Sequence, residues 1–263
     1  MADSLDNGGT GSFQTAWEDY WQKTFLLTKP NQDAESIWDI DVDRAAVRDF
    51  HRFAGEADLS LPLLDLGCGN GLQTQTLAQQ YPGRPVVGAD VSEAAVNLAA
   101  LRFGSPGLEY RTLDVLDGAA VAAFHEEFGD VNLYIRTLLH FIQADRRPLF
   151  VDAVETLIGE RGRLYLWELG AEAPAYFSAW IERNGMPRDL ERVLTSGVRP
   201  GSVTREQIIE LFPEGRFTRL QDGDDAGTPV PKVLAGPDGQ TAAEPWAPPC
   251  YWVVVKTGSA PVV

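Results

Sequence analysis

The chain has 263 residues, 44% of them hydrophobic and 10% aromatic, which provides ample material for a folded core and excludes a disordered protein. Its net charge is −16, from 38 acidic and 22 basic residues. Nucleic-acid binders neutralise phosphate groups with a basic face, which this composition does not favour. The same charge opposes binding to an anionic membrane surface, and no run of about 18 apolar residues predicts a transmembrane helix. We therefore expect neither nucleic acid nor a membrane as a partner.

The first part of the chain, residues 1–55, has its own character. Aromatic side chains gather there, and their helical spacing predicts a short amphipathic helix over Gln14–Thr24. A second helix is expected over Val42–Phe53, with Gly55 ending it. We interpret this part as a helical N-terminal arm. Its most prominent aromatic residues are Trp17, Tyr20, Trp21 and Trp38.

Residues 56–263 are interpreted as one α/β domain, because apolar strands and helices alternate along them. The expected strands are Leu61–Leu66, Pro85–Ala89, Leu108–Thr112, Val131–Ile135, Arg163–Trp167, Arg216–Gln221 and Tyr251–Lys256. The expected helices are Leu72–Gln80, Glu93–Phe103, Gly118–Phe128, Arg146–Ile158, Pro174–Asn184 and Thr204–Phe212. The pattern predicts a doubly wound, mostly parallel, seven-stranded sheet with helices on both faces. Asp222–Pro249, rich in Asp, Gly and Pro, is predicted as a long surface loop.

The strongest motif is a glycine-rich stretch between a predicted strand and a predicted helix, Leu63-Leu64-Asp65-Leu66-Gly67-Cys68-Gly69-Asn70-Gly71. Glycines let a ligand lie against the backbone and permit positive φ angles. The spacing is G-x-G-x-G, whereas a dinucleotide loop reads G-x-G-x-x-G around a pyrophosphate. Asp65 would repel a pyrophosphate and attract a cation. The motif therefore favours S-adenosylmethionine, which is cationic and has no phosphate, over a nicotinamide cofactor.

The stretch resembles the first motif of the class I S-adenosylmethionine-dependent methyltransferases, and the resemblance covers Leu61–Trp167. It implies that the acidic residue and the glycines of the motif line the methionine and ribose of the cofactor. These residues are Asp65, Gly67, Gly69 and Gly71.

Later positions complete the predicted cofactor site. Asp90 follows the second strand, about 20 residues beyond the loop, where a carboxylate can accept both ribose hydroxyls. The resemblance implies that Asp114 binds the adenine amino group with a backbone contact from Val115, although Asp117 is a competing candidate. It also implies that Arg136, after the fourth strand, lies near the methionine.

The acceptor is expected over the carboxyl ends of the fourth and fifth strands, near Arg136, Thr137, His140, Trp167 and Glu168. His140 is a candidate general base or a residue that only lines the pocket. Glu168 could accept a proton or hold an amine, or it could cap the next helix. The aromatic arm either closes over the cofactor as a lid or packs against the sheet.

We therefore predict a methyltransferase that uses S-adenosylmethionine to methylate O or N of a small molecule in specialised metabolism. The alternatives are a rearrangement, elimination or decarboxylation on the same cofactor, or a non-catalytic cofactor-binding subunit. No metal is expected, because no carboxylate cluster demands one. Two cysteines are too few for a disulfide framework, so we expect a cytoplasmic protein. A homodimer is compatible with the sequence.

Overall fold

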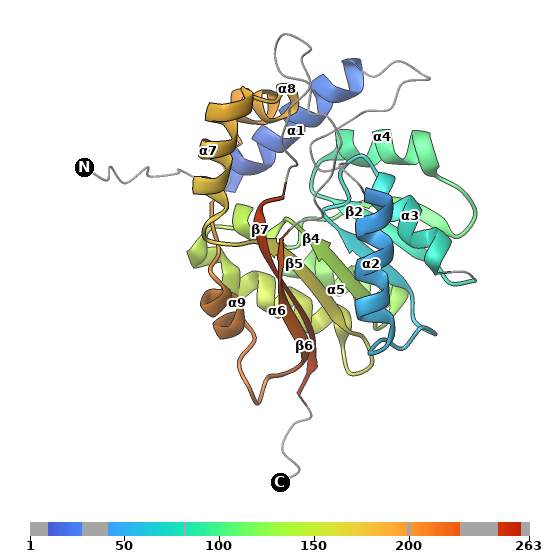
Figure 1. Cartoon of the computed structure of the whole chain (residues 1–263). Helices are drawn as coiled ribbons and strands as arrows, with labels where there is room; N and C mark the ends of the chain where they lie inside the picture. Colours follow the sequence, from blue (N-terminus) through green and yellow to red (C-terminus); the bar gives the residue numbers. More distant parts are fainter. Residues whose placement is uncertain (1–9, 28–41, 82, 199–200, 227–246, 259–263) are drawn as a thin grey trace.

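A computed structural model of the chain describes residues 10–27, 42–81, 83–198, 201–226 and 247–258. Its centre is a seven-stranded sheet in the order β3-β2-β1-β4-β5-β7-β6 (Figure 1). The strands are β1 (Leu63–Leu66), β2 (Val86–Asp90), β3 (Leu108–Thr112), β4 (Asn132–Arg136), β5 (Leu164–Leu169), β6 (Phe217–Ala226) and β7 (Pro249–Thr257). The first five are parallel, whereas β7 runs antiparallel to both β5 and β6. The predicted fold class is confirmed.

The helices cover both faces of this sheet. They are α1 (Thr10–Leu27), α2 (Val42–Ala54), α3 (Leu72–Gln80), α4 (Glu93–Phe103), α5 (Gly118–Phe128), α6 (Arg147–Ile158), α7 (Ala173–Asn184), α8 (Arg188–Thr195) and α9 (Arg205–Leu211). Two 3₁₀ turns, η2 (Leu139–Phe141) and η3 (Ala144–Arg146), lie between β4 and α6. Helices α5, α6 and α9 pack on one face, and α2, α3, α4 and α7 pack on the other.

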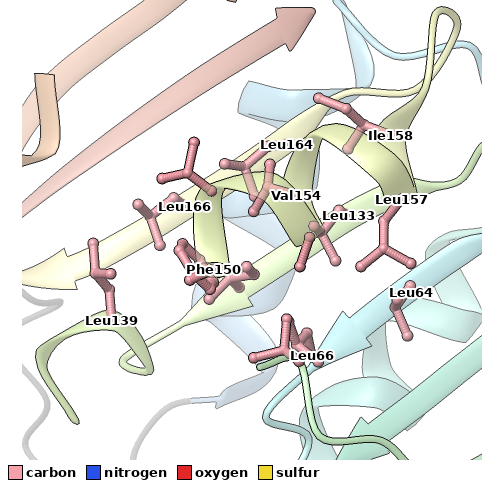
Figure 2. Packing of buried hydrophobic residues seen from close by; sticks show 14 of the residues in the cluster. Leu64, Leu66, Leu133, Leu139, Phe150, Val154, Leu157, Ile158, Leu164 and Leu166 are labelled. Carbon is pink, nitrogen blue, oxygen red and sulfur yellow. The ribbon is translucent and has the colours of Figure 1, made fainter. Parts of the chain in front are cut away.

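The larger core cluster fills the space between the sheet and α6 (Figure 2). Alternate residues of the central strands, such as Leu133 on β4 and Leu166 on β5, point to this face and meet Phe150 and Val154 of α6. These four side chains are completely buried, and each such burial stabilises the fold by about 1.5–3 kcal/mol. A rigid layer of this kind holds the carboxyl ends of the strands in place.

The other face carries the residues that alternate with these. Asp65 of β1 pairs with Gly88 of β2 and Tyr134 of β4, and Arg136 of β4 pairs with Trp167 of β5. The chain passes from β1 to β2 on one side, while β4 lies on the other side of β1. Such a reversal of strand order is the point at which open α/β sheets bind ligands.

The N-terminal helices pack in different ways. Phe50 and Phe53 of α2 belong to the core cluster on the sheet's second face. Helix α1 instead forms a third cluster with α4, η2 and α8, in which Tyr20 and Trp21 are buried. Figure 1 shows α1, α7 and α8 gathered at one end of the sheet.

Two local predictions were wrong. The stretch Asp222–Pro249 is not a loop throughout, because β6 continues to Ala226 and β7 begins at Pro249. Polar residues are accommodated at the start of this stretch because β6 is an edge strand and their side chains find partners, as Asp222 does with the Tyr251 hydroxyl (2.8 Å). Helix α8 was not predicted, since it is short and mostly polar, with Leu190 and Val193 as its buried apolar residues.

Candidate functional site

The turn between β1 and α3 is built from left-handed backbone. Gly67, Gly69 and Gly71 have φ angles of 81°, 52° and 80°, a region that other residues adopt only at a cost. Gly71 is also hemmed in by packing, because a Cβ there would lie 2.7 Å from the Cβ of Ala99 and 2.9 Å from the Tyr110 ring. The turn therefore requires glycine and presents bare backbone at the carboxyl end of β1.

Helix α1 covers this turn. A Cβ on Gly69 would lie 2.7 Å from Cζ2 of Trp21, so the buried indole ring rests directly on the glycine. The same helix reaches α4, because the Glu18 carboxylate accepts hydrogen bonds from the Ser92 hydroxyl (2.7 Å) and the Ala94 N–H (3.3 Å). Burial acts to raise the pKa of Glu18, but these bonds outweigh it and lower the pKa. The N-terminal arm is thus attached on both sides of the glycine turn.

Asp65 is a buried carboxylate with one oxygen unused. Its Oδ2 accepts a hydrogen bond from the Thr74 hydroxyl at 2.7 Å, whereas its Oδ1 has no hydrogen-bond partner among the described residues. Burial raises the pKa of Asp65 to about 7, since the charged form loses its hydration. A cationic ligand beside this carboxylate would stabilise its ionised form.

Asp90 lies at the end of β2 and organises the same turn. Its Oδ2 accepts the Gly69 N–H and its Oδ1 accepts the Ser92 N–H, both at 3.0 Å. Burial raises the pKa of Asp90 to about 6, although these backbone N–H groups act in the opposite direction. Asp90, the residue predicted to bind the ribose, is therefore hydrogen-bonded to the glycine turn through Gly69.

The two acidic candidates after β3 differ in their surroundings. Asp117 caps α5, accepting the N–H groups of Ala119 (2.9 Å) and Ala120 (3.3 Å), so it has a structural use. Asp114 is partly buried, and within the part of the chain that the structure describes its carboxylate accepts one hydrogen bond, from the Leu116 N–H at 2.9 Å. Val115 is buried in the core cluster. This arrangement favours Asp114 over Asp117 as a ligand of an adenine.

Arg136 and Trp167 form a stacked pair at the ends of β4 and β5. The guanidinium carbon of Arg136 lies 4.4 Å from the centre of the Trp167 ring, and its Nη1 is 3.5 Å from the Gln73 side-chain oxygen. Trp167 is itself buried and donates its Nε1–H to Asp225 at 3.1 Å. The next residue, Thr137, has a φ of 56° and is the one non-glycine residue with positive φ in the described chain. Strained backbone of this kind is concentrated at functional sites.

His140 and Glu168 form a buried pair on the opposite face of the β4–β5 pair from Trp167. His140 Nδ1 lies 2.5 Å from Glu168 Oε1, and Glu168 Oε2 accepts the His140 backbone N–H at 3.2 Å. His140 Nε2 is buried and has no hydrogen-bond partner among the described residues. Glu168 does not cap the next helix, because Glu172 occupies that position. The pair holds one imidazole nitrogen, and the other is buried without a hydrogen-bond partner among the described residues.

The aromatic residues of the arm are brought next to this pair. The ring of Trp17 meets Phe141, the neighbour of His140, with centroids 5.0 Å apart, and it also meets Tyr20 at 5.6 Å. Tyr20 and Trp21 are buried, as expected for packing, and they pack over the glycine turn and η2, as expected for a lid. Trp38 lies outside the described residues.

Two site residues were not predicted. Thr74 bonds to Asp65, and Glu18 bonds to Ser92 across 74 positions of the chain. A threonine on the inner face of the helix after the glycine turn could have been selected by its helical position. No local signal identifies Glu18, because its partner becomes a neighbour only through the tertiary fold.

Comparisons with known proteins agree with this geometry. A model of the methyltransferase domain family matches residues 63–162. A crystal structure of an S-adenosylmethionine-dependent methyltransferase from Anabaena variabilis is similar over almost the whole chain, with 35% identity, 98% of this chain and 99% of that chain covered, and a TM-score of 0.79. The chain belongs to the S-adenosylmethionine-dependent methyltransferase family.

Curated relatives resemble shorter parts of this methyltransferase. A trans-aconitate 2-methyltransferase from Acidovorax is 38% identical over 27% of this chain and 27% of its own length. A ubiquinone biosynthesis O-methyltransferase from Brucella anthropi is 28% identical over 52% of this chain and 59% of its own length. The methyltransferase thus spans about a quarter of the first relative and three fifths of the second.

The residues of the methyltransferase fit the family's cofactor, S-adenosylmethionine. The turn at the carboxyl end of β1 is made of glycines in left-handed backbone, and the buried Asp65 Oδ1 beside it has no hydrogen-bond partner among the described residues. In the described ranges, no three or more His, Cys, Asp or Glu side chains are grouped so as to hold a metal ion. Within the same ranges, no helix has the length and hydropathy needed to cross a membrane.

Proposed function

We propose that this methyltransferase transfers a methyl group from S-adenosylmethionine to an oxygen of a small molecule, with His140 as the general base. The observation that carries the proposal is the His140–Glu168 pair, in which a buried imidazole keeps Nε2 without a partner beside the arm that covers the glycine turn. The alternative is transfer to a nitrogen atom of the small molecule, which would not require a general base.

The cofactor residues take the roles that their positions suggest. Asp65 and the glycines hold the methionine end of the cofactor, Asp90 accepts the ribose hydroxyls, and Asp114 receives the adenine amino group with Val115. The negative charge of Asp65 and Asp90 favours a ligand with cationic groups. When bound, S-adenosylmethionine supplies an electrophilic methyl group on a good leaving group. The protein must then orient the acceptor and exclude water.

His140 supplies the proton acceptor for a hydroxyl nucleophile. The Glu168 carboxylate accepts the Nδ1–H of the imidazole, which fixes the tautomer in which Nε2 carries the lone pair. An acceptor hydroxyl can therefore donate its proton to Nε2 as the oxygen attacks. Glu168 stabilises the imidazolium that results, which is the role of an orienting carboxylate in a histidine-based pair.

The names of the relatives support a small molecule as acceptor. Trans-aconitate, named by the first relative, is a small molecule, and the second relative is by name an O-methyltransferase of ubiquinone biosynthesis. The net charge of −16 supports the same class, since it disfavours nucleic acid. Cys68 and Cys250 are both buried and are too few for a disulfide framework, which supports a reducing, cytoplasmic location.

We assign the lid to the α1 part of the arm of residues 1–55. Trp17 and Trp21 lie over η2 and the glycine turn, whereas α2 contributes Phe50 and Phe53 to the core of the sheet. Removing residues 1–39 should therefore abolish turnover while leaving the circular dichroism of the remaining domain nearly unchanged. Global unfolding of the truncated chain would instead show that α1 is part of the core.

The test of the proposed reaction is a methyl-transfer assay with labelled S-adenosylmethionine and a panel of small hydroxyl and amine acceptors, followed by formation of S-adenosylhomocysteine. His140→Gln and Glu168→Gln should each reduce kcat by about 100-fold or more, in the range typical of a lost general base. His125→Gln is the matched control, because His125 pairs with Asp130 in a half-exposed position.

Folding of both variants is checked by circular dichroism and by S-adenosylhomocysteine binding. Full activity of His140→Gln with hydroxyl acceptors would remove His140 from the mechanism. Tight cofactor binding by the wild type without product on any acceptor would favour a non-methylating or non-catalytic role.

A further inference from the structure

Arg136 is a partly buried cation at the carboxyl end of β4 with no carboxylate partner among the described residues. We propose that its guanidinium binds a carboxylate of the acceptor, so that the substrate of this methyltransferase is an organic acid. The inference rests on the proposed function, because it names the class of acceptor for the same site.

The direct contacts of Arg136 include no carboxylate among the described residues, and the charges of Asp49 and Asp65 act on it from beyond ion-pair distance. One face of the guanidinium lies 4.4 Å from the Trp167 ring centre, and one N–H reaches the Gln73 oxygen at the outer limit of a hydrogen bond, 3.5 Å. No carboxylate oxygen of the described residues lies within the 4.0 Å of an ion pair. The Trp167 ring covers one side of the guanidinium, and among the described side chains its N–H groups have one hydrogen bond, the long one to Gln73.

The other charges in the same layer are already matched. Asp225 is 3.2 Å from Arg48 and 2.9 Å from Arg52, and Asp49 is 3.0 Å from Arg48 and 3.7 Å from Arg52. Two arginines therefore face two carboxylates between α2 and the sheet. Arg136 is the remaining cation of this layer within the described ranges.

The position of Arg136 favours the acceptor over the cofactor as the source of the carboxylate. The predicted cofactor ligands Asp65 and Asp90 belong to β1 and β2. Arg136 lies between the two sides, because its guanidinium contacts Trp167 of β5 at 4.4 Å and reaches Gln73 of α3 at 3.5 Å. The fifth strand lies on the far side of β4 from the glycine turn. A carboxylate bound on the Trp167 side of the guanidinium would lie away from the predicted cofactor ligands Asp65 and Asp90.

The chemistry of arginine suits this ligand. A planar guanidinium can donate two parallel N–H bonds to one carboxylate, and stacking on an aromatic ring orders it beforehand. A chain with a net charge of −16 repels anions over long distances, so an acidic substrate needs a local cation at the site. Arg136 provides that cation where the acceptor is expected.

The experiment compares acids with uncharged derivatives, of which 4-hydroxybenzamide has nearly the same shape as its acid. The protein saturated with S-adenosylhomocysteine is titrated by calorimetry with trans-aconitate and its trimethyl ester, and with 4-hydroxybenzoate and 4-hydroxybenzamide. The variants are Arg136→Gln, Arg136→Lys and, as matched control, Arg84→Gln, since Arg84 is exposed in the turn before β2. Affinity for S-adenosylhomocysteine is measured for each variant in the same buffer.

We expect the wild type and Arg84→Gln to bind at least one acid about tenfold or more tightly than its neutral analogue, a difference typical of a charged hydrogen bond. Arg136→Gln should lose this preference, Arg136→Lys should keep part of it, and S-adenosylhomocysteine affinity should change by less than about threefold.

Three results would overturn the inference. The first is no binding of either acid, and the second is equal binding of acids and neutral analogues by the wild type. The third is an Arg136→Gln variant that keeps the acid preference but binds S-adenosylhomocysteine at least tenfold more weakly, because Arg136 would then hold the cofactor's own carboxylate. If S-adenosylhomocysteine itself fails to bind the wild type, the proposed function fails as well, which the separate cofactor titration reveals.

Discussion

Replacing Asp65 with Asn should stabilise the cofactor-free protein, and the gain should grow with pH. The Asp65 carboxyl is buried, and burial raises its pKa from 3.8 to about 7. Each tenfold change in an ionisation constant corresponds to about 1.4 kcal/mol, so the fold disfavours the ionised form by about 4 kcal/mol. Asn fills the same volume, can still bond to the Thr74 hydroxyl, and carries no charge.

The direction of the pH dependence follows from the raised pKa. Between about pH 4 and pH 7 the unfolded chain carries Asp65 ionised while the folded chain holds the proton. Unfolding then releases a proton, so the free energy of unfolding of the wild type decreases as the pH rises through this window and is level above it. Asp65→Asn lacks this decrease. The difference between the two proteins should therefore be small near pH 4 and should approach 4 kcal/mol above pH 7.

The assay is urea unfolding at pH 5, 6, 7 and 8 without cofactor, followed by tryptophan fluorescence and circular dichroism. Asp117→Asn is the matched control, because Asp117 is exposed and an Asn there can keep the cap of α5. A stability difference for Asp65→Asn that is the same at pH 5 and pH 8, or a loss that grows with pH, would refute the reasoning. Calorimetry should show that the same variant binds S-adenosylmethionine more weakly at pH 8.

Other predictions concern the cofactor cradle. Affinity for S-adenosylmethionine should rise from pH 5 to pH 8, because Asp65 and Asp90, with pKa values raised to about 7 and about 6, attract the cation only when ionised; a flat calorimetric profile would contradict this. Asp90→Ala should weaken binding by more than about tenfold, whereas Asp117→Ala should leave the affinity unchanged and cost about 1 kcal/mol in urea unfolding. Gly69→Ala should abolish binding by driving a Cβ to 2.7 Å from Trp21, and the double variant with Trp21→Ala should regain part of it; no regain would mean that φ strain alone is responsible.

The regular half of the fold was predictable because its signals are local. Helices α3, α4 and α5 begin and end at the predicted residues. Each starts after a glycine or a capping side chain such as Ser92, and α4 and α5 are followed by glycine. The capping box at Thr204 and Gln207, which starts α9, was confirmed in the same way. The predicted bounds of β3 were confirmed, those of most other strands moved by one or two residues, and the end of β6 moved by five, because strand ends are set by pairing with neighbours.

The irregular half was less predictable because its stability comes from contacts distant in the sequence. The extension of β6 through Asp225 depends on Arg52, 173 positions away, and on the Trp167 indole. The pairing of His140 with Glu168 joins η2 to β5 in the same way. His140 and Glu168 could be selected as candidates from their residue types and from their positions after β4 and in β5. Which nitrogen of His140 is engaged could be read only from the tertiary structure.

The reversal of β7 has a consequence for how such a protein can diversify. Because β7 is antiparallel to both of its neighbours, β6 ends and β7 begins at the end of the sheet where the parallel strands finish. The glycine turn and Arg136 lie at this same end. Changes at the end of β6 or the start of β7 can therefore alter the surroundings of Trp167, while β1 and β2, which carry Asp65 and Asp90, stay untouched. The direction of one strand, β7, thus allows the residues proposed to bind the acceptor to change separately from those proposed to bind the methyl donor.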